Sequence, residues 1–448
     1  MFLIIVIDLL VAGGLCAIAF NSGLERALPF ATFMIVFLPI ECRIPLGAFE
    51  LTTHRLILVI LGALYFFLGR KSTRGVASRV LPLKWIICAH VTWCLVSTAA
   101  SIVPMMSVKK LLSVVLEYYL LYFIYWKTVS RVQTIRKILM AMVLALIVCS
   151  VFGTFEAYRG LQILSLLPSV DHRFGSLPGE AERELRVQTT FDHAILYGAA
   201  LAMAIMLDLY LLDGARKTWQ KILLWCGLLL MFFNIYKTSS RGPWLDVILG
   251  CLLLVLVGGK GVRNRILFVG VLSVAVMVIR PGIWHTVEGI YENTMDTNTD
   301  TGASYEYRYA LPRAATKTVL RTPGRALWGY GLESFFDAGV EGEFLGKPHQ
   351  FLSADDSWVE LMVETGFVGL FLIAVLLWKP VFLSWSEFRR LRGPGKYLCA
   401  VLFVNMAIFY FQMYSVGMYS WGQNGYMLWI LIAVSLAYGK CRMAESAL

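Results

Sequence analysis

Long apolar runs, most of them joined by short connectors, constrain this chain more than any other feature. Runs of this length cross a hydrocarbon core about 30 Å thick, and about thirteen can be read along the sequence. We expect spans near residues 2–20, 27–40, 56–69, 84–102, 108–126, 138–153, 193–212, 219–236, 243–258, 266–281, 358–378, 397–416 and 425–439. The runs at 27–40 and 56–69 are the weakest. The one long polar segment, Ile283 to Ser357, is therefore expected to lie in water.

The composition indicates the same class of protein. Hydrophobic residues make up 58% of the chain and charged residues 15%, and the mean hydropathy is +0.69. These values lie outside the range of soluble globular domains. We therefore expect an all-α polytopic membrane protein with about 12–14 transmembrane helices, built as a single transmembrane domain over residues 1–448. Two outward insertions are expected within it, a smaller one at 154–192 and a larger one at 282–357.

The basic residues predict the orientation. They gather in alternate connectors, near residues 70–84, 127–137, 216–221, 260–265, 379–396 and 440–442. Cytoplasmic loops carry such an excess of lysine and arginine. We therefore expect the loops at 41–55, 154–192, 237–242, 282–357 and 417–424 to face outward. This bias accounts for most of the net charge of +11, and no basic segment interleaved with aromatic residues indicates nucleic acid as a partner.

Neither the N-terminus nor the cysteines suggest processing or a metal site. The first run contains Asp8 and lacks both a basic start and a cleavage site, so we expect a retained span and not a signal peptide. The nine cysteines are scattered, and only Cys42 falls in an outward loop. No disulfide framework or zinc spacing can be read, and we expect no metal and no cofactor.

Two outward segments place ionisable residues directly beside spans. Arg186 is followed by Asp192 and His193, which open a span. Helix capping alone would also explain Asp192, because a helix N-terminus stabilises a carboxylate. Arg241 lies beside Gly242 in the second segment, where its guanidinium could bind a phosphate through two hydrogen bonds. Placement of a long side chain at the membrane interface is the alternative role for Arg241.

The larger insertion contains a segment with the apolar spacing of a helix. It runs from Ser304, the expected N-cap, to Leu320. The segment holds Tyr305, Glu306 and Arg308. Aromatic rings on which sugars stack, beside charged groups that bind hydroxyls, suit a saccharide site. The same residues equally suit a solvated helix.

The end of the larger insertion carries a run of acidic residues. Asp355 and Asp356 come just before Trp358 at the start of a span, and Glu360 and Glu364 then share one helix face. One aspartate is expected to be the N-cap, which leaves the other available for chemistry. Ionisable residues inside a span are functional candidates, because burying them is unfavourable unless they are paired.

Three motifs in this order carry a resemblance to a known family. They are "SSRGPWL" at 239–245, "RTPGRALWGYGLESF" at 321–335 and "DDSWVELMVETGFVGLFL" at 355–372. Together with "RVQTTFDHAILYGAALA" at 186–202, they resemble the O-antigen ligase and polymerase family over Arg186 to Leu372. The resemblance implies an all-helical GT-C-like bundle in the bacterial inner membrane, with its active site facing the periplasm. It also implies an undecaprenyl-diphosphate-linked glycan as donor, a glycan or lipid A core as acceptor, and inverting transfer.

The resemblance also implies roles for individual residues. Cations must stabilise the departing diphosphate and a base must accept the proton of the acceptor hydroxyl. No metal is needed if the first role falls to Arg186, Arg241 and Arg308. Ligases of the family carry a histidine before the serine of the third motif, whereas this chain has aspartate there, so the candidate catalytic residues are Asp355, Asp356 and His349. The acceptor or sugar is expected to contact His193, Tyr305, Glu306 and Trp358.

The missing histidine also bears on the kind of reaction. Aspartate in its place resembles exopolysaccharide and O-antigen polymerases more than ligases, so we expect a polymerase, with a ligase as the alternative. A transporter of lipid-linked glycans is an alternative from another class. It would be expected to carry ionisable residues along many spans and paired repeats, whereas this chain has few such residues and no repeat.

Overall fold

The structure, a computed structural model, describes residues 2–46, 49–69, 81–167, 186–279, 288–289, 292–419 and 421–445. The first half contains α1 (Phe2–Ser22), α2 (Leu24–Phe37), β1 (Arg43–Leu46), β2 (Phe49–Thr52), α3 (Thr53–Leu64), η1 (Tyr65–Gly69), α5 (Lys84–Ala99), α6 (Pro104–Ser113), η2 (Val114–Tyr119), α7 (Leu120–Thr128), α8 (Val132–Arg159) and η3 (Ile163–Leu166). The second half contains α9 (Ala194–Gly214), α10 (Thr218–Lys237), α11 (Arg241–Val257), α12 (Lys260–Ile279), α14 (Asp300–Val319), α15 (Pro323–Trp328), β3 (Glu341–Phe344), β4 (Lys347–Gln350), α16 (Ser357–Arg390), α17 (Pro394–Gln412) and α18 (Gly422–Glu445).

Each expected span coincides with helical structure. Among the described residues, six helices are long and apolar enough to cross a membrane: Phe2–Ser22, Val132–Arg159, Ala194–Gly214, Thr218–Lys237, Ser357–Arg390 and Gly395–Gln412. Other expected spans coincide with shorter helices, such as α2, α5 and α11, and the one at 108–126 is divided into α6, the π-helical η2 and α7. The prediction of an all-α polytopic membrane protein is therefore confirmed.

The bundle is built around α9. This helix is apolar on all sides and packs against α8, α10, α11 and α17. A helix of that kind belongs in the interior of a bundle, and nearly its whole length is buried. The core continues through α18, which packs on α7, α16 and α17.

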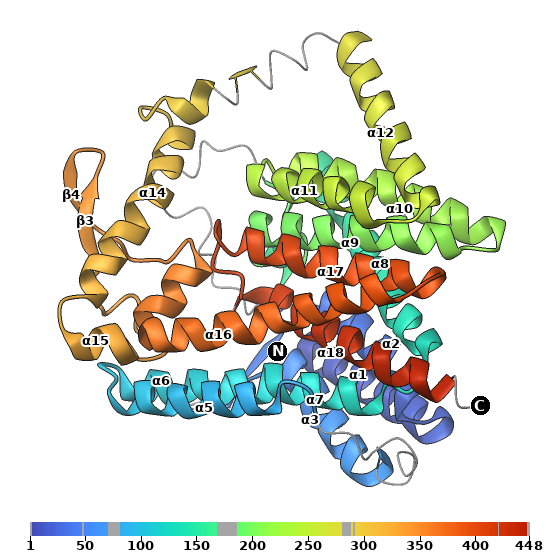
Figure 1. Cartoon of the computed structure of the whole chain (residues 1–448), viewed down its shortest axis with the longest axis horizontal. Helices are drawn as coiled ribbons and strands as arrows, with labels where there is room; N and C mark the ends of the chain where they lie inside the picture. Colours follow the sequence, from blue (N-terminus) through green and yellow to red (C-terminus); the bar gives the residue numbers. More distant parts are fainter. Residues whose placement is uncertain are drawn as a thin grey trace.

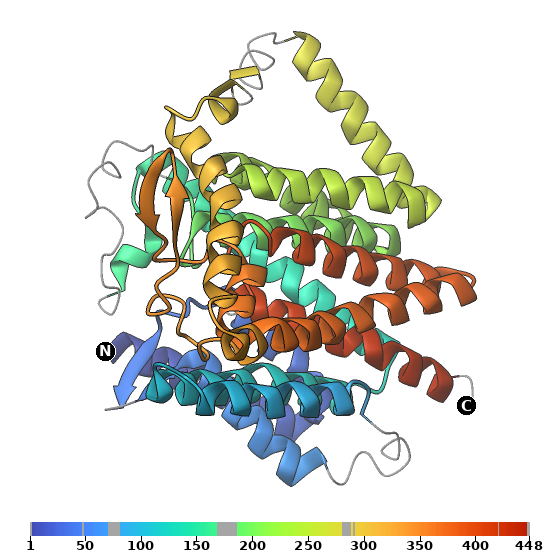
Figure 2. The ribbon, with the colours of Figure 1, turned by 60° about the vertical axis from the view of Figure 1, so that its left-hand side comes forward.

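The two ends of the bundle carry different connections. The N-terminus, the β1–β2 hairpin, α14 and the β3–β4 hairpin lie toward one end, and the C-terminus and the α11–α12 and α16–α17 connections lie at the other (Figure 2). This arrangement agrees with the expected alternation of outward loops and basic connectors. Residues 70–80, which hold most of the first basic connector, lie outside the described residues.

The boundaries of the smaller insertion differ from the prediction. Helix α8 continues to Arg159 and ends at Gly160 in the left-handed conformation (φ 65°), so the insertion begins at 160 and not at 154. Residues 168–185 of this insertion lie outside the described residues, as do 280–287 at the start of the larger one.

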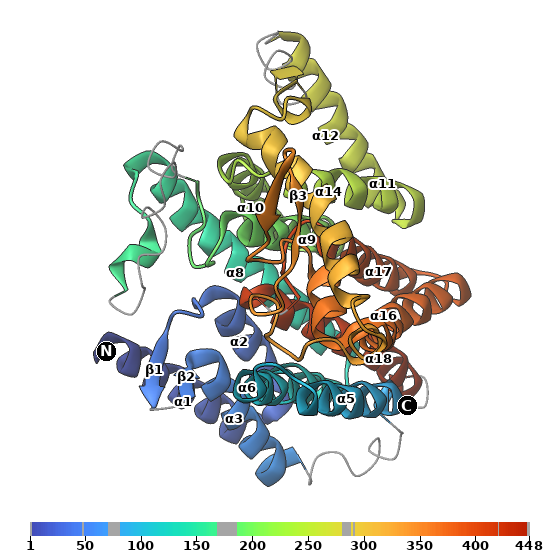
Figure 3. The same cartoon turned by 90° about the vertical axis from the view of Figure 1, so that its left-hand side faces the viewer.

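The larger insertion forms a small core of its own at the end of the bundle that Figure 3 views directly. Buried residues of α14, among them Leu311 and Ala315, pack against Phe351 and against Val363 of α16. The expected helix is present, but Ser304 is not its N-cap. Helix α14 begins at Asp300, because the Thr299 hydroxyl accepts a hydrogen bond from the Gly302 amide at 3.0 Å.

A segment of the same insertion packs against a break in α16. Gly366 interrupts the helix with φ 69°, and a Cβ there would lie 2.1 Å from the Leu327 carbonyl oxygen, so only glycine fits. The Glu364 carbonyl accepts a hydrogen bond from the Gly331 amide at 2.9 Å. Residues 327–334, hereafter the strap, are thereby fixed between α16 and the turn that joins α5 to α6 (Figure 1).

Candidate active site

Arg186 is docked onto the turn that presents Arg241. Its Nε donates to the Thr238 carbonyl at 2.9 Å and its Nη2 to the Ser240 hydroxyl at 2.5 Å. The turn itself contains Ser239 in the left-handed region (φ 48°). These contacts join two segments that the sequence analysis had only treated separately, and they place Arg186 and Arg241 at the same end of α11.

Arg241 is the first residue of α11, and its Nη1 donates to the Thr294 hydroxyl of the larger insertion. Gly242 follows it against the end of α17. A Cβ at Gly242 would lie 2.8 Å from Gln412 Nε2 and 3.2 Å from the Ser415 hydroxyl, so a side chain would push the turn away from α17. The Arg241 guanidinium is half-buried between α11 and the larger insertion. A cation in such a position can bind an anionic ligand.

Arg308 reaches the same region from α14. Its Nε donates to the Ser415 carbonyl at 3.2 Å and its Nη1 to the Ser304 hydroxyl at 3.0 Å. The Arg308 charge acts on Arg241 and on the loop before α9. Arg186, Arg241 and Arg308, the three arginines expected at the diphosphate, therefore converge, and we refer to them as the arginine cluster.

The two aspartates before α16 have separate environments. Asp356 is buried and caps the helix, with its Oδ1 accepting from the amides of Trp358 at 2.7 Å and Val359 at 3.1 Å. Burial raises the pKa of Asp356 to about 6 despite these two hydrogen bonds. The prediction that one of the two aspartates is the N-cap is thus confirmed, and the N-cap is Asp356.

Asp355 is the carboxyl near Arg308 of the arginine cluster. The Ser353 hydroxyl donates to it at 3.4 Å, and it is half-buried. Burial raises the pKa of Asp355, and the nearby Arg308 guanidinium and the Ser353 hydrogen bond oppose that rise. A carboxylate that is partly desolvated beside a cation can accept a proton from a hydroxyl.

His193 and not Asp192 caps α9, so the capping role considered for Asp192 is wrong. The His193 Nδ1 accepts from the Ile195 amide at 3.1 Å, which leaves Asp192 Oδ2 to accept from the Trp421 indole at 2.7 Å. Burial, together with the charges of Arg186 and Arg308 and against the opposing charge of Asp192, lowers the pKa of His193 to about 4. His193 is therefore neutral at physiological pH and lies beside the arginine cluster.

Other residues expected at the site lie elsewhere. His349 of β4 packs in an aromatic group, with ring centroids 5.0 Å from both Phe344 and Phe351. Tyr305 is 52% exposed on α14, and no contact of the adjacent Glu306 with the arginine cluster is found among the described residues. Their roles as base or sugar contacts remain predictions.

Trp358 faces an apolar groove beside the bundle. Its indole nitrogen donates to the Tyr410 carbonyl at 3.4 Å. The groove lies between α11, α16 and α17 and is lined by Leu249, Leu253, Trp358, Leu370, Ala374, Trp378, Phe403, Ala407, Tyr410 and Phe411. Leu249 and Leu253, which line the groove from α11, lie about 12–18 Å along the helix from Arg241, and Trp358 lies three residues after Asp355.

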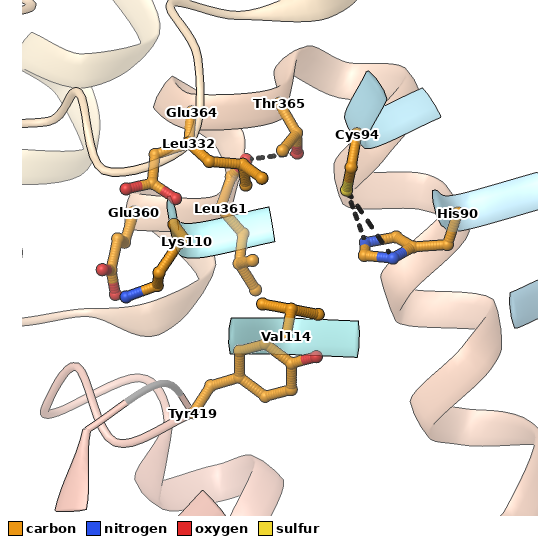
Figure 4. A pocket seen from close by; sticks show the side chains of 10 residues that line it. All are labelled: His90, Cys94, Lys110, Val114, Leu332, Glu360, Leu361, Glu364, Thr365 and Tyr419. Carbon is orange, nitrogen blue, oxygen red and sulfur yellow. Dashed lines mark hydrogen bonds between the residues drawn. The ribbon is translucent and has the colours of Figure 1, made fainter. Parts of the chain in front are cut away.

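Glu360 and Glu364, the predicted pair on α16, line a different pocket with Lys110 of α6 and Tyr419 (Figure 4). Lys110 forms an ion pair with Glu333 of the strap at 2.7 Å, and the Glu333 amide donates to Glu364 at 2.7 Å. These contacts therefore hold the strap against α6 and α16. Lys110 and Glu333 could not be predicted as partners, because they lie more than 200 positions apart in the sequence.

No group of three or more histidine, cysteine or acidic side chains is arranged to hold a metal in the part of the chain that the structure describes. The nine cysteines are free, and Cys42, expected in an outward loop, is buried.

Comparison with known proteins agrees with the resemblance of the motifs. No curated protein matches the chain. Residues 226–374 match the family described as O-Antigen ligase. The matched region begins within α10 and ends within α16, so it contains Arg241, Arg308 and both aspartates, whereas Arg186 and His193 precede it. The match covers 149 of the 448 residues, and over this region the chain is similar to the O-antigen ligase family, which supports a part in the biosynthesis of cell-surface polysaccharide.

Proposed function

We propose that this protein is a polysaccharide polymerase. It transfers a glycan from an undecaprenyl-diphosphate-linked donor to a hydroxyl of a saccharide acceptor. The observation that carries the proposal is the convergence of Arg186, Arg241 and Arg308 from three separate segments beside Asp355. Three cations in one place suit a ligand that carries several negative charges, as a diphosphate does.

The proposed reaction needs no group beyond these side chains. The bond between the anomeric carbon and the diphosphate oxygen breaks, and the arginine cluster stabilises the negative charge left on the diphosphate. The acceptor oxygen forms the new bond from the opposite face of the sugar, which inverts the anomeric carbon. Its proton passes to the Asp355 carboxylate.

The apolar groove gives the lipid part of the donor a place to bind. Its lining contains five aromatic residues of α16 and α17 and aliphatic residues of α11. An isoprenoid chain in this groove would be surrounded by apolar side chains while its diphosphate reached Arg241 at the start of α11. The donor would then enter from the membrane, and not from water.

The expected orientation gives the reaction its compartment. Described basic connectors, those between α11 and α12 and between α16 and α17, lie at the end of the bundle opposite the β3–β4 hairpin (Figure 2), whereas Arg241 lies at the other end of α11, where the helix begins. Basic connectors face the cytoplasm. We therefore assign the arginine cluster to the periplasmic side of the inner membrane.

The preference for polymerase over ligase rests on Asp355, which occupies the position where family ligases are expected to carry histidine. The test is transfer by the purified protein in lipid nanodiscs, supplied with a lipid-diphosphate-linked repeat unit and, separately, with lipid A core. Longer lipid-linked glycan is the expected product. Glycan attached to lipid A core identifies a ligase instead.

Variants connect the product to the site. Arg241→Ala should abolish transfer. Arg321→Ala serves as the matched control, because Arg321 is exposed and its guanidinium donates to the Gly339 carbonyl in the same insertion. Intact donor moved across the membrane with no new glycosidic bond would reject the enzyme and identify a transporter.

A further inference from the structure

A second group of polar and aromatic side chains lies beside the arginine cluster, and all of its members lie outside residues 226–374. Glu41 comes from the segment after α2, Asp192 and His193 from the segment before α9, and Trp421 from the segment before α18. Three segments that are far apart in the sequence therefore meet at one place.

Trp421 is held in position without being buried. Its indole N–H donates to Asp192 Oδ2 at 2.7 Å, and its ring centroid lies 5.7 Å from that of His193 at an angle of 41°. The residue nevertheless remains 37% exposed. A large aromatic ring that is fixed at one edge and open to solvent is a ready apolar surface for a ligand.

Asp192 also interacts with a second carboxyl group. Glu41 is only 5% exposed, and it is coupled to Asp192 by a hydrogen bond and by charge, with Arg43 as the nearby cation. Burial and the neighbouring Asp192 charge raise the pKa of Glu41, which favours the protonated form of the Glu41 carboxyl. Such a pair offers both an O–H donor and carboxylate acceptors to a neighbouring hydroxyl group.

Gln423 joins the segments that carry these residues. Its Nε2 donates to the Leu38 carbonyl at 3.0 Å and to the Thr190 carbonyl at 2.8 Å. Gln423 is 1% exposed. One buried amide therefore fixes the end of α2, the loop before α9 and the start of α18 relative to one another, so the positions of Glu41, Asp192 and Trp421 do not depend on a ligand.

The group borders the arginine cluster through His193, on which the charges of Arg186 and Arg308 both act. A sugar joined directly to a diphosphate bound by that cluster would lie next to the cluster, on the side where His193 borders it. An apolar ring face beside hydroxyl-binding carboxyl groups matches the two surfaces of a pyranose, which has C–H groups on its faces and hydroxyls around its edge.

We propose that Trp421, Asp192 and Glu41 form a saccharide subsite that binds the first sugar of the lipid-linked donor, an inference that rests on the proposed function. The pyranose stacks on Trp421, and its hydroxyls bond to the Asp192–Glu41 pair. The subsite recognises the sugar and the arginine cluster recognises the diphosphate, so the two parts of the donor are bound independently.

The test measures binding of two probes to the full-length protein in nanodiscs. One probe is a polyprenyl diphosphate monosaccharide and the other is the same polyprenyl diphosphate without sugar. Trp421→Ala should weaken binding of the sugar-bearing probe about tenfold, the loss expected from one aromatic contact, and leave the other probe unchanged. Arg241→Ala should weaken both, and Trp219→Ala, at an exposed tryptophan at the start of α10, should weaken neither.

Conservative variants separate binding from folding. Trp421→Phe keeps an aromatic face but loses the N–H to Asp192, so it should bind the sugar-bearing probe more tightly than Trp421→Ala does. Glu41→Gln replaces the Glu41 carboxyl with an amide and should weaken only the sugar-bearing probe. If the alanine variant does not fold, these two variants decide the question by the same comparison of probes.

Each other outcome overturns a stated part. Equal weakening of both probes by Trp421→Ala, or no weakening of either, rejects the saccharide subsite. If Trp421→Ala leaves donor binding unchanged and raises the KM for the acceptor, the subsite binds the acceptor, and the assignment to the donor is rejected. Failure of Arg241→Ala to weaken either probe, or no binding of either probe to the wild-type protein, rejects the proposed function and the subsite with it.

Discussion

The two aspartates before α16 should respond oppositely to the same substitution. Asp355→Asn removes the only proton acceptor that we assign to the reaction, so turnover should fall by about 100- to 10,000-fold, the usual contribution of a general base. The protein should remain folded, because the single Ser353 hydrogen bond to Asp355 at 3.4 Å is long. Asp356→Asn should retain most activity, since asparagine caps a helix about as well as aspartate.

The magnitude at Asp356 follows from its two hydrogen bonds. Asp356→Ala leaves the amides of Trp358 and Val359 without the acceptor that now lies at 2.7 and 3.1 Å. Loss of such a cap destabilises a protein by about 1–2 kcal/mol. Thermal unfolding at a fixed scan rate should therefore show a lower midpoint for Asp356→Ala than for Asp356→Asn, whereas Asp355→Asn should match the wild type.

Turnover of the purified variants, measured as bond formation with the lipid-linked donor, provides the decisive comparison. Asp337→Asn is the matched control, because Asp337 is an exposed aspartate of the same insertion. Full activity in both Asp355→Asn and Asp356→Asn, together with inactivation by His349→Ala, would identify His349 as the base. It would also remove the argument that aspartate at this position favours a polymerase.

Three further predictions concern the cluster, the orientation and pH. Arg241→Lys should lose most transfer activity although it keeps the charge, because an ammonium cannot bind phosphate through a planar fork; wild-type activity in a transfer assay would reject that geometry. Thr297→Cys should react with a membrane-impermeant reagent in cells whose outer membrane is permeabilised, and labelling only after inner-membrane lysis would reverse the orientation. Burial and the negative charge of Asp192 raise the pKa of Glu41 from 4.5 to about 7. The folded state therefore binds this proton more tightly than the unfolded state, and stability should fall by about 3 kcal/mol as pH rises from 4.5 past 7. Unfolding midpoints measured against pH should flatten in Glu41→Gln, and an unchanged slope would contradict the carboxyl pair.

Hydrophobic pattern and length were sufficient to predict most of the fold. A membrane requires the backbone of each span to satisfy its own hydrogen bonds, so an apolar run of adequate length has helix as its only form. Caps were harder to assign, because several residues compete for each helix start. Ser304 and Thr299 are both good caps by type, and Asp192 is a better one than His193. In both cases tertiary contacts decided: Asp192 is engaged by Trp421, and the loop at 296–299 folds back on itself.

Site residues could be predicted from the sequence where a charged side chain is unusual at its position. They could not be predicted where the site forms from segments that are far apart in the sequence. An arginine in an outward turn of a membrane protein is already unexpected, and Arg241 was identified on that ground. Glu41 and Trp421 give no such signal, because a carboxylate or an indole in an outward loop is ordinary. Their significance arises only when the Gln423 amide binds the carbonyls of Leu38 and Thr190 and so brings three distant segments together. A substrate with a charged part and a neutral part would then be bound by two kinds of residue, the arginines and the residues around Trp421. Only the arginines are conspicuous in a sequence as apolar as this one.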